Sequence, residues 1–180
     1  MKKFFMVFVC LVAMIVLSSC GSDYKTTNMA TELSPIFKEY SNWASNDLVV
    51  EQFKEKMISF FNSATDKNFS TFYNGKVRFD EIIQAENRNV NATDSVVVRF
   101  KCSDHVSLEN TKGGHDIFTV KFDVIGKIHK SEASKLNGDI DYHLDGDIFG
   151  FLADVELDKH PIPTVDMGHI LCKNLIVIQN

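Results

Sequence analysis

The sequence predicts a mainly β protein of the α+β kind: a small five-stranded antiparallel barrel preceded by one or two helices. Two observations predict it. Between residues 34 and 64, apolar residues recur every three or four positions, which is typical of amphipathic helices. From residue 74 onward they alternate with polar residues in five segments separated by turn-rich stretches, which is typical of half-buried strands. Five such strands can bury their apolar face by closing into a barrel.

The chain opens with "MKKFFMVFVCLVAMIVLSSCGS", which is typical of an export signal. Two lysines precede an apolar run over residues 4–17 that is too short to span a membrane. The "LSSC" that follows resembles the lipobox of bacterial lipoproteins, in which the cysteine receives diacylglycerol and becomes the mature N-terminus. The resemblance implies a cleaved signal peptide at residues 1–19 and lipidation of Cys20. The alternative is an ordinary signal peptide with a chance cysteine.

Length and charge limit what the mature chain can be. Removing residues 1–19 leaves 180 − 19 = 161 residues, enough for one domain, and the loss of two lysines takes the formal charge from −5 to −7. Bulk electrostatics does not hold such an acidic chain to nucleic acid, so a nucleic-acid partner is not expected. We expect a domain anchored by its lipid to a bacterial membrane in the cell envelope, facing the periplasm or the exterior.

The segment between the lipid and the strands divides into a tether and two helices. Residues 20–33 are polar and without pattern, which predicts a flexible tether before a domain at residues 34–180. "SPIF" predicts a helix start, with Ser34 as N-cap and Pro35 in the first turn. A second, stronger helix follows Asp47. Its apolar stripe consists of Val49, Phe53, Met57, Phe60 and Ala64.

Five segments read as strands: "GKVRF", "SVVVRFKC", "FTVKFDVIGKI", "GDIDYHLDGDIFGF" and "HILCKNLIVIQ". In each of them apolar and polar residues alternate, wholly or in part. Because side chains of a strand alternate between its two faces, one face of each should line the barrel and the other should meet water.

The fourth strand carries an acid or a histidine at every second position. Its apolar residues alternate with these, so the polar side chains share one face about 7 Å apart, too far for adjacent positions to bind one metal ion. An EF-hand loop is excluded because Leu152 stands where the twelfth-position Glu is needed. We interpret the face as solvated, with no metal or cofactor; the alternative is a weak cation site shared by Asp145, Asp147 and a neighbouring loop. The polar set is Asp139, Asp141, His143, Asp145 and Asp147.

Four stretches, "FYNGKVRFDEII", "VVVRFKC", "LNGDIDYHLDGDIFGF" and "HILCKNLIV", resemble the small tRNA-anti-like OB-fold domains of exported bacterial proteins. The resemblance covers about residues 55–180. It implies an OB-like barrel whose ligand lies across the outer faces of the second and third strands. There Arg99, Lys101, Lys121 and Lys127 would form a small basic patch without aromatic platforms, with Arg99, Lys101 and Lys121 as the predicted ligand residues. The alternative is an ordinary solvated strand face.

Two cysteines remain once the signal is removed and Cys20 is lipidated. Cys102 and Cys172 both fall in apolar strand patterns. An exported protein can form disulfides, so we predict a possible bond between them; the alternative is two buried free thiols.

Catalytic motifs are missing from the sequence: it has no HExxH, GxSxG, P-loop or GxGxxG. We therefore expect a non-catalytic, lipid-anchored binding or interaction module for a glycan, peptide or protein partner. One alternative is a structural subunit of an envelope assembly. Another is an unrecognised hydrolase that uses loop histidines and aspartates. These pairs are His105 with Asp104, His115 with Asp116, and His160 with Asp158.

The lipobox can be tested by substitution. Cys20→Ala should release the protein from the membrane pellet and change its electrophoretic mobility, because two or three acyl chains hold a domain on a membrane and none remains in the variant. The matched control is Cys10→Ala, which alters a cysteine inside the signal and should leave fractionation unchanged. A Cys20→Ala protein that stays in the pellet with unchanged mobility would contradict the lipidation.

Overall fold

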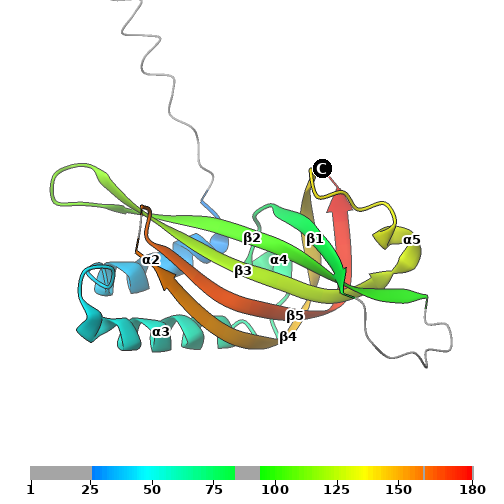
Figure 1. Ribbon diagram of the computed structural model, residues 1–180, viewed down its shortest axis with the longest axis horizontal. Helices are drawn as coiled ribbons and strands as arrows, with labels where there is room; N and C mark the ends of the chain where they lie inside the picture. The colour runs from blue at the N-terminus through cyan, green and yellow to red at the C-terminus, as the bar shows by residue number, and fades with distance from the viewer. Residues whose placement is uncertain (1–25, 84–93, 160, 180) are drawn as a thin grey trace, which may run out of the picture.

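The computed structural model describes residues 26–83, 94–159 and 161–179 (Figure 1). The predicted signal peptide at residues 1–19 and Cys20 lie outside them. The helical elements are α2 (Asn28–Glu39), the 3-10 turn η1 (Asp47–Val49), α3 (Val50–Asn62), α4 (Phe69–Phe72) and α5 (Lys130–Ala133). The strands are β1 (Val77–Ile83), β2 (Ser95–Glu109), β3 (His115–His129), β4 (Asp141–Asp158) and β5 (Thr164–Gln179).

The strands form a closed barrel in the order β1-β2-β3-β5-β4, so the mainly β fold with five strands and leading helices is confirmed. The expectation that every pair is antiparallel is wrong, because β3 and β5 run parallel. The reason lies in the pairings. β1 and β3 are both antiparallel to β2 and so run in the same direction. β4 is antiparallel to β1, and β5 is antiparallel to β4, so β5 runs in the same direction as β3.

Two long hairpins make up most of the sheet, and β1 closes it. β2 pairs with β3 over the whole length of both strands, and β4 pairs with β5 over nearly all of theirs. In the described part of the chain β1 meets β4 at two register positions, Val77↔Tyr142 and Arg78↔Asp141. We call this short contact the seam. Beyond the seam both hairpins continue as an open sheet whose apolar inner face needs another cover.

Helices α2 and α3 provide that cover. Figure 1 shows them along the half of the strands that is remote from β1 and α5, with α2 against β2 and α3 against β4. The ring of Phe37 from α2 lies 5.0 Å from that of Phe118 on β3. The ring of Phe61 from α3 lies 5.5 Å from Phe122 on β3 and 5.1 Å from Phe151 on β4. The core therefore continues from the barrel interior into a layer between helices and sheet.

The first helix begins earlier than its proline indicated. Helix α2 starts at Asn28, capped by Thr27, so residues 28–33 are helical and not part of a flexible tether, and Pro35 lies inside the helix. The physical reason is burial. Met29, Leu33 and Phe37 form one fully buried stripe that crosses the proline. Burying each is worth about 1.5–3 kcal/mol, which together exceeds the roughly 3 kcal/mol cost of an interior proline.

The second helix follows its predicted stripe with one change. Phe53, Met57 and Ala64 are fully buried as expected. Phe61 is also fully buried, whereas Phe60 is only half-buried. Near the end of the helix the buried position is therefore Phe61 in place of Phe60. There Phe61 contacts the aromatic residues of β3 and β4.

Truncation of Phe61 tests whether the helical layer stabilises the barrel. Phe61→Ala should lower the free energy of unfolding by about 3–5 kcal/mol, because it leaves a cavity among three aromatic rings. Phe149→Ala is the matched control. Phe149 is 51% exposed on β4, so its loss should cost about 1 kcal/mol or less. Urea denaturation of both variants gives the comparison, and equal losses would contradict the arrangement.

Candidate binding groove on the outer face of the barrel

A groove of about 600 Å³ lies on the outer face where β1, β2, β3 and the start of β5 run side by side. The register brings its residues together: Arg78 is opposite Lys101, and Lys121 is opposite both Ser103 and Asp166. Four of the lining side chains are basic and two are carboxylates. The lining residues are Lys76, Arg78, Lys101, Cys102, Ser103, Lys121, Asp141 and Asp166.

One wall of the groove is built on the seam. Asp141 of β4 accepts from the Nε of Arg78 at 3.0 Å and from the Nζ of Lys76 at 3.2 Å. The hydrogen bonds from Arg78 and then Lys76 hold the pKa of the Asp141 carboxyl below its ordinary value. Asp141 therefore fixes two cations at the groove edge and ties β1 to β4 through their side chains.

The other two cations differ in their pairing. The Nζ of Lys101 lies 2.7 Å from Asp80, whose pKa is lowered first by that hydrogen bond, yet the Lys101 side chain remains 63% exposed. Lys121 is exposed and has no ion pair among the described residues. An anion in the groove would meet Lys121 without first displacing a carboxylate.

Arg99, one of the three predicted ligand residues, does not line this groove. Its Nη2 lies 2.6 Å from Glu81, and its Nε lies 2.8 Å from Asp80 and 3.8 Å from Asp123. The guanidinium of Arg99 on β2 thus forms ion pairs with three carboxylates from β1 and β3, so Arg99 links three strands. Lys101 and Lys121, the other two predicted ligand residues, line the groove.

Sequence reasoning missed Lys76 and Arg78. The alternation of "GKVRF" places both residues on the face opposite Val77, and this signal could have identified them. Their approach to Lys101 depends on the pairing of β1 with β2, and their approach to Asp141 depends on the seam. Neither contact can be read from alternation alone.

The polar side chains of β4 share one face, as predicted. They are half-buried, and hydrogen bonds to other side chains matter more there than contact with solvent. Asp145 accepts from the Nδ2 of Asn68 at 2.6 Å, and Asp147 accepts from the Nδ2 of Asn174 at 3.0 Å. No group of three His, Cys, Asp or Glu residues that could hold a metal ion occurs in the described ranges. The buried residues that alternate with this face are Tyr142, Leu144 and Ile148.

The predicted disulfide is not formed. Cys102 and Cys172 are free and buried. Cys102 is opposite Phe122 and Cys172 is opposite Gly126, on two different sides of β3 and four residues apart along it, about 13 Å. A disulfide needs Cα atoms within about 7 Å. Burial raises the pKa of Cys172 to about 12 and that of Cys102 well above its ordinary value, so both thiols stay protonated and poorly nucleophilic.

Two histidines expected in loops lie in strands. The Nδ1 of His105 in β2 is 3.2 Å from the Thr119 hydroxyl, and the Nδ1 of His115 in β3 is 3.1 Å from the Ser107 hydroxyl. Asp104 points inward, where burial raises its carboxyl pKa and the Thr27 hydroxyl donates to it. None of these residues lines the groove. His160 lies outside the described residues.

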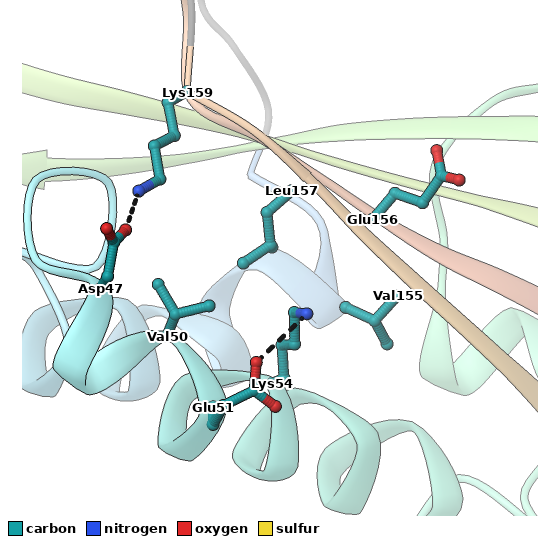
Figure 2. A pocket seen from close by; sticks show the side chains of 8 residues that line it. All are labelled: Asp47, Val50, Glu51, Lys54, Val155, Glu156, Leu157 and Lys159. Carbon is teal, nitrogen blue, oxygen red and sulfur yellow. Dashed lines mark hydrogen bonds and ion pairs between the residues drawn. The ribbon is translucent and has the colours of Figure 1, made fainter.

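A second hollow of about 620 Å³ lies between α3 and the end of β4 (Figure 2). Figure 2 shows both of its lysines in ion pairs, Lys159 with Asp47 and Lys54 with Glu51. Its basic groups are therefore compensated within the hollow, which makes it a weaker candidate for a charged ligand. The apolar part of its wall consists of Val50, Val155 and Leu157.

Comparison with protein-family models, curated proteins and solved structures gives no match to this chain. Among the described residues no helix is long and apolar enough to cross a membrane.

Removal of the seam carboxylate has a pH-dependent effect. Because the folded pKa of Asp141 is lowered from 3.8, its contribution to stability is present above that value and is lost as pH falls through the folded pKa. Asp141→Asn should cost about 1 kcal/mol of unfolding free energy at pH 7, the scale of two exposed ion pairs, and the difference should shrink in acid.

Asp139→Asn is the control for this prediction. Asp139 is exposed two residues before Asp141 and has no ion pair among the residues described. Urea titrations of the three proteins across the acid range measure the effect. A gap between wild type and Asp141→Asn that does not change with pH would show that the ion pairs are not its cause.

Proposed function

We propose that this chain is a lipid-anchored, non-catalytic binding module of the bacterial cell envelope. In this proposal an OB-like barrel uses its outer groove to bind anionic groups of a partner. The closed five-stranded barrel supports the OB-like interpretation, and so does the position of the groove. OB-folds bind extended ligands across strands two and three, and three of the groove's basic residues come from β1, β2 and β3.

The observation that carries the proposal is the charge of the groove. Four basic side chains face two carboxylates in a protein whose mature formal charge is −7. Such a local reversal of sign favours carboxylate, sulfate or phosphate groups. No aromatic residue lines the groove, so base stacking of the kind that single-stranded nucleic acids require has no platform there. An acidic peptide, an acidic glycan or a protein with such groups fits this chemistry.

Catalysis has less support than binding. No histidine lines the groove, so the Ser103 hydroxyl has no imidazole base beside it there. Cys102 also lines the groove, but its side chain is buried, and burial holds the thiol in its protonated form. The pairs of His105 with Asp104 and of His115 with Asp116 lie elsewhere on β2 and β3, and Asp104 is buried.

A structural subunit of an envelope assembly is the second candidate. One observation favours it: large apolar side chains are exposed on the hairpin of β4 and β5, a composition common at protein contacts. These residues are Phe149, Leu152, Ile176 and Ile178, each about half exposed.

Charge reversal at Lys121 tests the groove. Lys121→Glu should weaken binding of polyglutamate and dextran sulfate roughly tenfold at low salt, and the loss should shrink at high salt. Lys127→Glu is the matched control, because Lys127 is an exposed lysine on the same strand that does not line the groove. The measurement is equilibrium binding of each polyanion to the purified folded protein.

The same two variants can be used to recover partners by cross-linking in envelope extracts. Partners lost with Lys121→Glu and kept with Lys127→Glu would be groove partners. Binding that is equally weakened by both reversals would reflect net charge alone and would argue against the groove.

A further inference from the structure

The chain enters the domain beside the groove. The Thr27 hydroxyl donates to the Asp104 carboxylate of β2, and the backbone N–H of Asn28 donates to the Asn74 side chain at 2.9 Å. The Nδ2 of Asn28 also donates to the carbonyl of Thr71 at 3.1 Å. These bonds hold the start of α2 against β2 and against the segment that leads into β1.

The partners of this entry point are sequence neighbours of groove residues. Asp104 follows Ser103, and Asn74 precedes Lys76 by two positions. The Tyr73 hydroxyl joins the two, because it lies 3.1 Å from the carbonyl of Lys76 and 3.2 Å from that of Ser103. The entry point and one end of the groove therefore belong to a single hydrogen-bonded cluster.

The length of chain before this cluster is short. Six residues lie between Cys20 and Thr27, and the seven steps from one to the other span about 25 Å when fully extended. With helix α2 starting at Asn28, the tether is about half the length that the sequence indicated. A lipid on Cys20 thus keeps the entry point within about that distance of the bilayer surface.

Charge selects which face turns to the bilayer. The mature chain carries a formal charge of −7, so an anionic phospholipid surface repels most of the domain. The lining side chains carry two positive charges in excess, but Asp80 outside the groove pairs with Lys101, so one positive charge remains uncompensated, and Lys121 has no ion pair among the described residues. Near an anionic bilayer, one such charge favours the orientation with the groove inward by roughly fivefold.

We propose that the groove docks on the anionic phospholipid surface of the membrane that carries the lipid on Cys20, and so fixes the orientation of the domain. This inference rests on the proposed function, since it names the partner of the same groove and uses the same anchor.

Lysine accessibility tests the docking. The full lipid-bearing protein is reconstituted into phosphatidylcholine vesicles with or without phosphatidylglycerol and pulsed with an amine-reactive reagent. Mass spectrometry then gives the labelling rate of each lysine. Labelling of Lys76, Lys101 and Lys121 should fall roughly fivefold relative to Lys127 when phosphatidylglycerol is present, and high salt should restore it.

A second arm separates this inference from the proposed function. Polyglutamate is added to the phosphatidylcholine vesicles, and the same labelling rates are measured. Protection by polyglutamate without protection by phosphatidylglycerol would overturn membrane docking and leave the binding groove standing. No protection in either arm would overturn both, as would a mature protein whose mass shows no lipid on Cys20.

Discussion

A five-stranded sheet with two long hairpins can close only where its remaining strand reaches both, and the rest of this structure depends on that limit. β1 reaches β4 at Val77 and Arg78 and no further among the described residues. Beyond this seam the hairpins expose an apolar inner face, which two helices must cover. The chain therefore needs its leading helices as part of the core, and Phe61 joins them to the barrel strands.

The seam also determines the chemistry of the outer face. Asp141 closes the barrel through Arg78 and Lys76, and the same two cations form an edge of the groove. An anionic ligand there competes with Asp141 for its partners, so binding and closure of the barrel share one set of charges. Lys121, on the far side, is outside this competition. Lys121 can therefore bind an anion directly, whereas Arg78 and Lys76 must first exchange Asp141 for the anion.

Periodicity along the chain predicted the kinds of elements but not their neighbours. Alternation identified every strand, because each has one buried face. It could not show that β5 would lie beside β3 or that Asp80 and Asp123 would form ion pairs with Arg99. Nor could it show that Cys102 and Cys172 would lie on the two strands that flank β3. These facts depend on residues distant in sequence. The start of α2 was placed too late because proline usually occurs in the first turn of a helix. In α2 the burial of residues before Pro35 outweighs this preference.

The shortness of the seam also has a kinetic consequence. Each hairpin joins residues that are close in sequence, whereas the ion pair of Arg78 with Asp141 joins positions 63 apart. Closing a loop of that length costs more chain entropy than forming either hairpin, and few contacts offset the cost at the moment of closure. We therefore expect the hairpins to form first and the barrel to close late. In the folded protein the amide protons of the seam should then exchange with solvent before those of the hairpins.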